Sequence, residues 1–228
     1  MKILHLYPNL MNLYGDYANV TLLCRHLKDQ GIPVVIDRKE VEDTINLMQY
    51  DFIYMGSGTE EKQLVALKDL IRYQQYLSLY IESGKSALFT GNAMELLGAS
   101  IDGNKALGIL DFTVETQEKR YTGDVIVKNP DIGEVVGFIN KSTLIHGGEE
   151  YRLFDYEFKE TSLADNSYEG YHYKNLYGTH IIGPVLVKNP EFMKEIVRMF
   201  CTEVYKDIPY PYEEEAYRTT LRELKKRK

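Results

Sequence analysis

The sequence predicts an α/β protein with a doubly wound, mostly parallel sheet and an antiparallel extension. In the first half, short apolar runs alternate with segments of helical period, the pattern of a parallel sheet that helices cover on both faces. In the second half, three apolar runs follow one another with no helix between them. Such a succession indicates antiparallel strands added to the same sheet.

The first half divides into strands and helices in turn. Strands are expected at residues 2–7, 34–37, 51–55 and 86–90, and helices at 17–30, 60–83 and 92–97. Gly31 and Gly84 stand just past the first two helices, where glycine commonly ends a helix. The apolar spacing of the first helix places Cys24 in the core.

The second half contains the expected extension and a terminal helix. Strands are predicted at 107–116, 121–127, 134–140 and 179–187, and a helix at 191–205 with Pro190 in its first turn. Residues 1–205 are read as one domain and 206–228 as a charged helical tail. Acidic residues begin this tail and basic residues end it, which suits the dipole of a solvated helix.

Composition excludes several classes of function. The 228 residues carry a net charge of −7, which argues against nucleic acid as the main partner. No apolar run approaches the ~20 residues of a membrane span, and the first residues lack the pattern of a signal peptide. Two distant cysteines and no zinc-type spacing lead us to expect a cytoplasmic protein with no disulfide, metal or cofactor.

Residues 86–98 (SALFTGNAMELLG) read as a strand, a sharp turn and a helix. This is the arrangement of a nucleophile elbow, in which a Cys or Ser at the apex is lifted over the end of the sheet. Here the apex is Gly91. The architecture for a nucleophile is therefore predicted, and the nucleophile is missing.

Five segments together resemble the class I glutamine amidotransferases, in the branch of cobyric acid synthase and the glutaminase subunit of lipid II isoglutaminyl synthase. They are residues 6–16 (LYPNLMNLYGD), 56–58 (GSG), the elbow 86–98, 136–140 (VGFIN), and the stretch from Glu169-Gly170 through Gly183-Pro184 to Lys188-Asn189-Pro190. The resemblance covers residues 1 to about 205 and implies a flavodoxin-like fold.

The resemblance also implies an activity for which this chain lacks the chemical groups. Such enzymes hydrolyse glutamine with a Cys thiolate and a His, and pass the ammonia to a synthetase or ligase. The Cys position falls on Gly91 and the His position on Ile182. The Gln after the nucleophile falls on Glu95, and an E-N-H motif reads Ile139-Asn140-Lys141.

Some of the substrate-binding scaffold is expected to survive. Gly58 and Asn92 are predicted to offer N–H groups to an oxyanion, and Arg120 falls where the branch holds the carboxylate of glutamine. For Glu95 two readings stay open, a charged substitute in the pocket or a helix residue facing solvent.

Two residues are candidate substitutes for the missing groups. Thr90 carries a hydroxyl next to the apex, although a strand-end Thr more simply makes a hydrogen bond. His180 lies two residues from Ile182 on the same face of a strand, or else packs where the family has Tyr.

Three functions follow as hypotheses. The first is a catalytically degenerate amidotransferase-like subunit that acts through a ligase-type, Mur-ligase-like partner. The second is an active glutaminase or other hydrolase that uses displaced groups such as Thr90 and His180. The third is a module that binds glutamine or a related amino acid through Arg120, Gly58 and Asn92.

Overall fold

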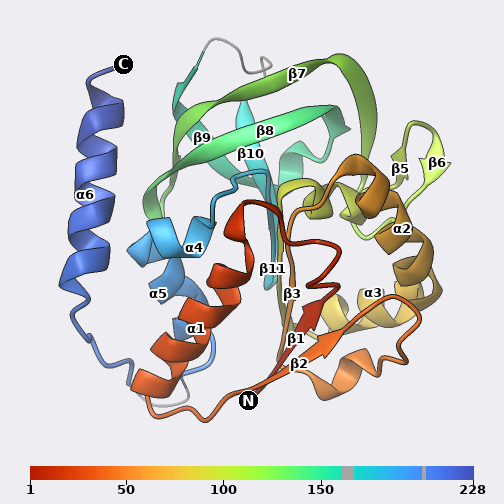
Figure 1. Ribbon diagram of the computed structural model, residues 1–228, viewed down its shortest axis with the longest axis horizontal. Helices are drawn as coiled ribbons and strands as arrows, with labels where there is room; N and C mark the ends of the chain where they lie inside the picture. The colour runs from red at the N-terminus through yellow and green to blue at the C-terminus, as the bar shows by residue number, and fades with distance from the viewer. Residues whose placement is uncertain (161–166, 202–203) are drawn as a thin grey trace.

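One mixed sheet runs through residues 1–160, 167–201 and 204–228, the part of the chain that the computed structural model describes (Figure 1). Its order is β2-β1-β3-β4-β11-β10-β9-β7-β5-β6, with β8 paired to β7. The first five strands in this order are parallel to one another. They are β2 (Val35–Lys39), β1 (Lys2–Leu6), β3 (Phe52–Met55), β4 (Ser86–Thr90) and β11 (Leu176–Thr179).

The remaining strands form the extension that the sequence predicts. All but one of their pairings are antiparallel, and the exception joins β5 to β7. They are β10 (Tyr168–Tyr173), β9 (Arg152–Lys159), β7 (Phe112–Asn129), β8 (Gly133–Gly147), β5 (Ser100–Ile101) and β6 (Asn104–Lys105). Figure 1 shows β7 and β8 as a long curved ribbon over the carboxyl ends of the parallel strands.

Helices cover both faces of the parallel part (Figure 1). On one face lie α1 (Tyr17–Asp29), α4 (Val185–Lys188) and α5 (Pro190–Arg198), and on the other α2 (Glu60–Leu70) and α3 (Gln74–Glu82). The 3-10 turns are η1 (Leu13–Gly15), η2 (Leu47–Gln49), η3 (Ile71–Tyr73), η4 (Gly91–Leu97) and η5 (Glu149–Tyr151). The last helix is α6 (Pro211–Lys225). In the described residues, no helix is long and apolar enough to cross a membrane.

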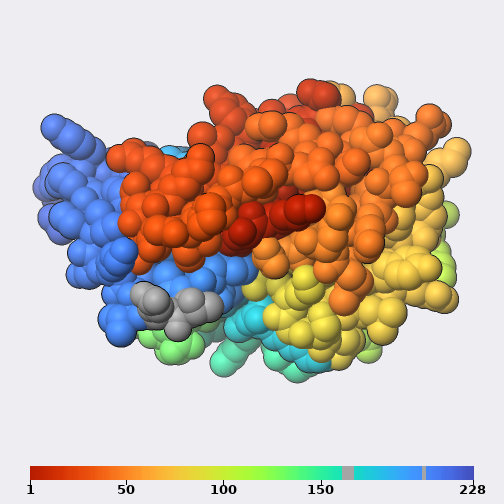
Figure 2. Space-filling model, turned by 90° about the horizontal axis from the view of Figure 1, so that it is seen from below, coloured from red at the N-terminus to blue at the C-terminus, as the bar shows by residue number. Residues whose placement is uncertain are grey.

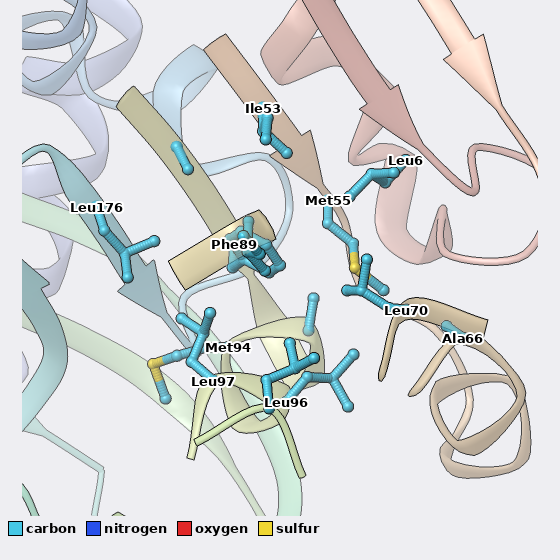
Figure 3. Close-up of a cluster of buried hydrophobic side chains, with 14 of the residues drawn as sticks. Leu6, Ile53, Met55, Ala66, Leu70, Phe89, Met94, Leu96, Leu97 and Leu176 are labelled. Carbon is cyan, nitrogen blue, oxygen red and sulfur yellow. The ribbon is translucent and has the colours of Figure 1, made fainter. Parts of the chain in front are cut away.

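Two apolar cores result because side chains alternate between the faces of each strand. In β4, Phe89 packs into the core beneath α2 and α3, and Leu88 packs into the core beneath α1 and α5. Figure 3 shows Phe89 between Ile53 and the side chains of the turn after β4. Full burial of such a side chain contributes about 1.5–3 kcal/mol, so the elbow rests on a rigid support.

The single helix predicted at 60–83 was wrong. It is broken at η3 into α2 and α3. The backbone of Tyr73 leaves helical geometry, and its hydroxyl donates to Asp43 O and accepts from the N–H of Ile45. This contact to a distant loop accounts for the break, and local periodicity does not reveal it. The short helix predicted at 92–97 is present as the 3-10 helix η4.

Several boundaries in the second half were wrong as well. The strands predicted at 107–116 and 121–127 are one strand, β7, with an irregularity between Thr116 and Tyr121. The strand predicted at 179–187 ends at Thr179, because Gly183 at φ +75° and Pro184 turn the chain into α4. The helix predicted at 191–205 ends at Arg198.

The charged tail forms the predicted helix, α6, and it is only partly solvated. Leu224 is buried against Ile126 and Val136 of the β7–β8 ribbon. Near its start, Glu213 lies 3.1 Å from the buried ring of His26 on α1. Figure 2 shows, from below, the blue C-terminal segment beside the red and orange N-terminal half. The division at residue 205 stays a prediction.

Candidate functional site

The turn after β4 has an elbow geometry with no room for a side chain at its apex. Gly91 has φ +59°, a left-handed conformation that L side chains rarely adopt. A β-carbon at this position would lie 2.5 Å from Ser57 Cβ and 3.1 Å from Ile182 Cγ2. The two family positions, Gly91 and Ile182, are therefore neighbours, as the resemblance implies, and the space between them is filled.

The loop after β3 is tied to the elbow by one amide side chain. Asn92 Oδ1 accepts from the N–H of Gly58 at 2.9 Å, and Asn92 Nδ2 donates to Gly58 O at 3.0 Å. The N–H of Gly58 is thus occupied, so the prediction that it faces an oxyanion was wrong for this conformation. The side-chain oxygen of Asn92 takes the place that an oxyanion would occupy at the N–H of Gly58.

A cavity of about 250 Å³ lies beside the elbow. Its lining includes Gly58, Asn92, Glu95 and Arg120, the four predicted substrate-binding residues. Neither Gly91 nor Ile182 lines it. The structure therefore gathers the predicted binding residues around one space, and the positions that the resemblance assigns to the Cys and the His lie outside its lining.

The mouth of this cavity is charged and hydrogen-bonded. Arg120 forms an ion pair with Glu60 at the start of α2 and donates to Asn140 Oδ1 at 2.8 Å. Asn140 Nδ2 donates in turn to the hydroxyl of Tyr14. The guanidinium is half exposed, so part of its donor capacity faces solvent.

Glu95 does not face solvent, so that reading was wrong. Its side chain is 2% exposed and lines the cavity floor. Glu95 accepts hydrogen bonds from the hydroxyl of Thr143 and from Gln63 Nε2, the latter at 2.7 Å. The same carboxylate lies 3.0 Å from His180 Nε2. Burial alone would raise the pKa of Glu95, but the hydrogen bond and charge of His180 outweigh it and lower that pKa.

His180 is buried between two carboxylates. Its Nε2 faces Glu95, and its Nδ1 lies 3.6 Å from Glu169 Oε2. Nε2 is within hydrogen-bond distance of Glu95 at 3.0 Å, whereas the contact of Nδ1 with Glu169 is longer than a hydrogen bond. His180 does not line the cavity beside the elbow, so it is neither a displaced base there nor an ordinary packed ring.

Thr90 is also held away from the cavity. It is fully buried, donates to Asp16 Oδ2 at 2.9 Å, and lies 3.0 Å from the hydroxyl of Tyr54. Burial raises the pKa of Asp16 to about 6, so a hydroxyl does stand next to a weak base. With no exposed surface, this pair has no access to a substrate.

Lys141 is a cavity residue that the sequence reasoning did not assign. Its side chain, on β8, lines the cavity and is only 8% exposed. Burial lowers the pKa of Lys141, against the charges of Glu169 and Glu95. The signal was present in the sequence, because Lys141 replaces the last residue of the family's E-N-H motif.

Among the described residues, no group of three or more His, Cys, Asp or Glu side chains is arranged to hold a metal ion. The lining of the cavity supplies charged and amide groups. A hydrogen-bonding, mixed-charge cavity can bind and orient a small polar molecule.

The model of the CobB/CobQ-like glutamine amidotransferase domain matches residues 2–190. The chain belongs to this family. A 33% identical relative is the lipid II isoglutaminyl synthase (glutamine-hydrolyzing) subunit GatD of Staphylococcus aureus, with 92% of this chain and 87% of the relative covered. The subunit of that name from Streptococcus pneumoniae is 28% identical, with 92% and 85% covered.

Solved structures support the family's fold. The chain matches PurLQS from Thermotoga maritima with a TM-score of 0.61 at 13% identity, over 88% of this chain and 99% of the other. At this identity the match shows a shared fold alone. The prediction of a class I amidotransferase fold is confirmed, as is the resemblance to the branch that includes the GatD relatives.

Proposed function

We propose that this chain is a glutamine amidotransferase-like subunit of the lipid II isoglutaminyl synthase type that no longer hydrolyses glutamine. Membership of the family and the similarity to the two GatD subunits support the type of assembly. The observation that carries the loss of chemistry is the filled apex, where Ser57 and Ile182 occupy the surroundings of Gly91. A nucleophilic thiolate has neither its residue nor its space.

The degenerate subunit acts through a ligase-type partner, a Mur-ligase-like chain encoded by the same genome. Loss of glutaminase chemistry leaves two tasks for such a subunit, stabilising the ligase and controlling the entry of free ammonia. The departures at positions 91 and 182 are buried, so a docking surface on the outside of the fold does not depend on those two side chains.

The first test is ammonia release from glutamine by the purified chain. We expect no release above a heat-killed control, while the Staphylococcus aureus GatD subunit, assayed in parallel with its ligase partner, is active. Clear turnover by this chain would overturn the proposal. Thr90→Ala and His180→Ala would then show whether displaced groups carry the reaction.

The second test addresses the partner. The chain is co-expressed with the Mur-ligase-like protein of its genome and purified through a tag on one of them. A stable one-to-one complex is expected, with ligase activity on free ammonia that rises when the chain is present. Separate elution and unchanged ligase activity would remove the subunit role.

A further inference from the structure

The ammonium group of Lys141 lacks a hydrogen-bond partner in the described part of the chain, and no carboxylate oxygen lies within 4.0 Å of it there. The side chain is buried while its ammonium group faces the cavity, so the cost of desolvating this charge is only partly compensated. Lys141 lines the cavity beside the elbow, where a bound anion can reach it. An anionic group of a ligand would supply the missing partner.

The two nearest carboxylates are already engaged by other donors. Glu95 is held by Thr143, Gln63 and His180. Glu169 Oε1 accepts from Thr179 Oγ1 at 2.6 Å and from the N–H of His180 at 2.7 Å. His180 lies between them and offsets their charge. Lys141 therefore keeps its hydrogen-bonding capacity for the cavity.

The mouth of the cavity offers one charge of each sign. Arg120 and Glu60 form an ion pair there, and both are about half exposed. A guanidinium matches a carboxylate, and a carboxylate matches an ammonium, so the pair is complementary to the head group of an α-amino acid. The volume of about 250 Å³ lies below the usual range of pockets for drug-sized ligands, which suits a molecule of this size.

We propose that this cavity binds an acidic α-amino acid, glutamate in preference to glutamine. Arg120 and Glu60 hold the α-carboxylate and α-ammonium groups at the mouth, and Lys141 holds the side-chain carboxylate at depth. The neutral amide of glutamine would leave the ammonium without a counter-charge. The proposed function assigns no reaction to this cavity, and the inference assigns it a ligand. The inference rests on the proposed function.

The test is calorimetric titration of the full chain with glutamate, glutamine and aspartate. We expect saturable binding of glutamate, at least tenfold tighter than that of glutamine. Lys141→Met should weaken the binding of glutamate at least tenfold and reduce the difference in affinity between glutamate and glutamine. Lys105→Met, at an exposed position on β6, is the matched control and should bind as the wild type does.

Circular dichroism shows whether Lys141→Met is folded. If Lys141→Met is unfolded, Arg120→Met, at the exposed mouth of the cavity, is used in its place. This variant should weaken the binding of glutamate and of glutamine to the same extent. Equal or tighter binding of glutamine, glutamate binding that survives Lys141→Met, or no binding of any of the three would overturn the inference. These outcomes are distinct from ammonia release and from failure to join a ligase, which test the proposed function itself.

Discussion

The side chain of Ser57 occupies the space that a β-carbon at position 91 would need. The two residues follow neighbouring strands of the sheet, β3 and β4, and meet just beyond the ends of these strands. Two restrictions therefore act on position 91 together, the positive φ of its backbone and the presence of Ser57. Each restriction predicts a separable effect of mutation.

Gly91→Cys should lower the stability of the fold. A non-glycine residue in this conformation costs on the order of 1–3 kcal/mol, and overpacking against Ser57 adds a similar amount. Thermal unfolding measures the sum. Gly103→Ala is the matched control, because Gly103 has φ +74° and nothing within 4 Å of an added β-carbon. Equal losses in the two variants would refute the clash.

Ser57→Gly should partly rescue Gly91→Cys. It removes the two Ser57 atoms that the new β-carbon meets, and it leaves the closer approach to Ile182 Cγ2 and the backbone strain in place. We expect the double variant to recover about 1–3 kcal/mol relative to Gly91→Cys. A double-mutant cycle of the three proteins measures the coupling, and a coupling near zero would show that Ser57 is not the obstacle.

Glu95→Gln should destabilise the chain by about 3 kcal/mol. It replaces the closer of the two buried carboxylates that face His180, and breaking a buried pair is costly even though Glu169 stays beside the ring. Glu115→Gln is the control, since Glu115 pairs with His146 where both are more than half exposed. That variant should stay within about 0.5 kcal/mol of the wild type in urea unfolding. Comparable losses of stability in Glu95→Gln and Glu115→Gln would contradict the view that burial makes the Glu95–His180 pair costly to break.

Asp16→Asn should change how stability depends on pH. Burial raises the pKa of Asp16 from 3.8 to about 6, so the folded state binds more protons between these values. The free energy of unfolding of the wild type therefore loses a contribution as pH rises from 4 to 6, about 3 kcal/mol for such a shift. Asparagine does not titrate, and its oxygen still accepts from Ser57 and Thr90.

Urea unfolding at several pH values tests this prediction. The stability of Asp16→Asn relative to wild type should rise between pH 4 and pH 7 and stay level above that. Asp102→Asn, which removes a carboxylate that accepts from Thr116 at an exposed site, should show a smaller trend. A relative stability of Asp16→Asn that is flat across this range would count against the buried charge.

Leu224→Ala should loosen α6. The side chain is 6% exposed and packs on the β7–β8 ribbon, so truncation is expected to cost about 2–5 kcal/mol, and amide exchange should rise in α6 before the sheet. Leu64→Ala, at a half-exposed position on α2, should leave exchange in α6 unchanged. Unaltered amide exchange of α6 in Leu224→Ala would mean that the other contacts of this helix, its ion pairs among them, are sufficient to keep it in place.

The parallel half of the fold could be predicted because its signals are local. Alternation within 51–55 and 86–90, and the glycine at 84, each depend on near neighbours in the chain. The break at Tyr73 could not, because its cause is a hydrogen bond to Asp43. Nor could the merging of two strands into β7, which the pairing with β8 and β9 determines.

At the site, the sequence identified positions and missed contacts. Gly91, Ile182, Arg120 and Glu95 were placed by their motifs, and the structure brings them to one end of the sheet. That Asn92 occupies the N–H of Gly58 depends on a pair 34 residues apart, for which no periodic signal exists. The burial of Lys141 likewise depends on residues far from it in the sequence, such as Glu60 and Glu95, which line the same cavity.

Because Ser57 and Ile182 fill the space around position 91, no single substitution gives the chain the catalytic Cys and His of the family. A thiol regained at position 91 meets Ser57 before it meets a substrate, and an imidazole regained at position 182 finds no thiol to activate. A glycine introduced at position 57 only empties the space beside position 91 and supplies neither group. None of the three changes alone supplies both a thiol and an imidazole with room to act, so the family's catalytic pair requires all three together.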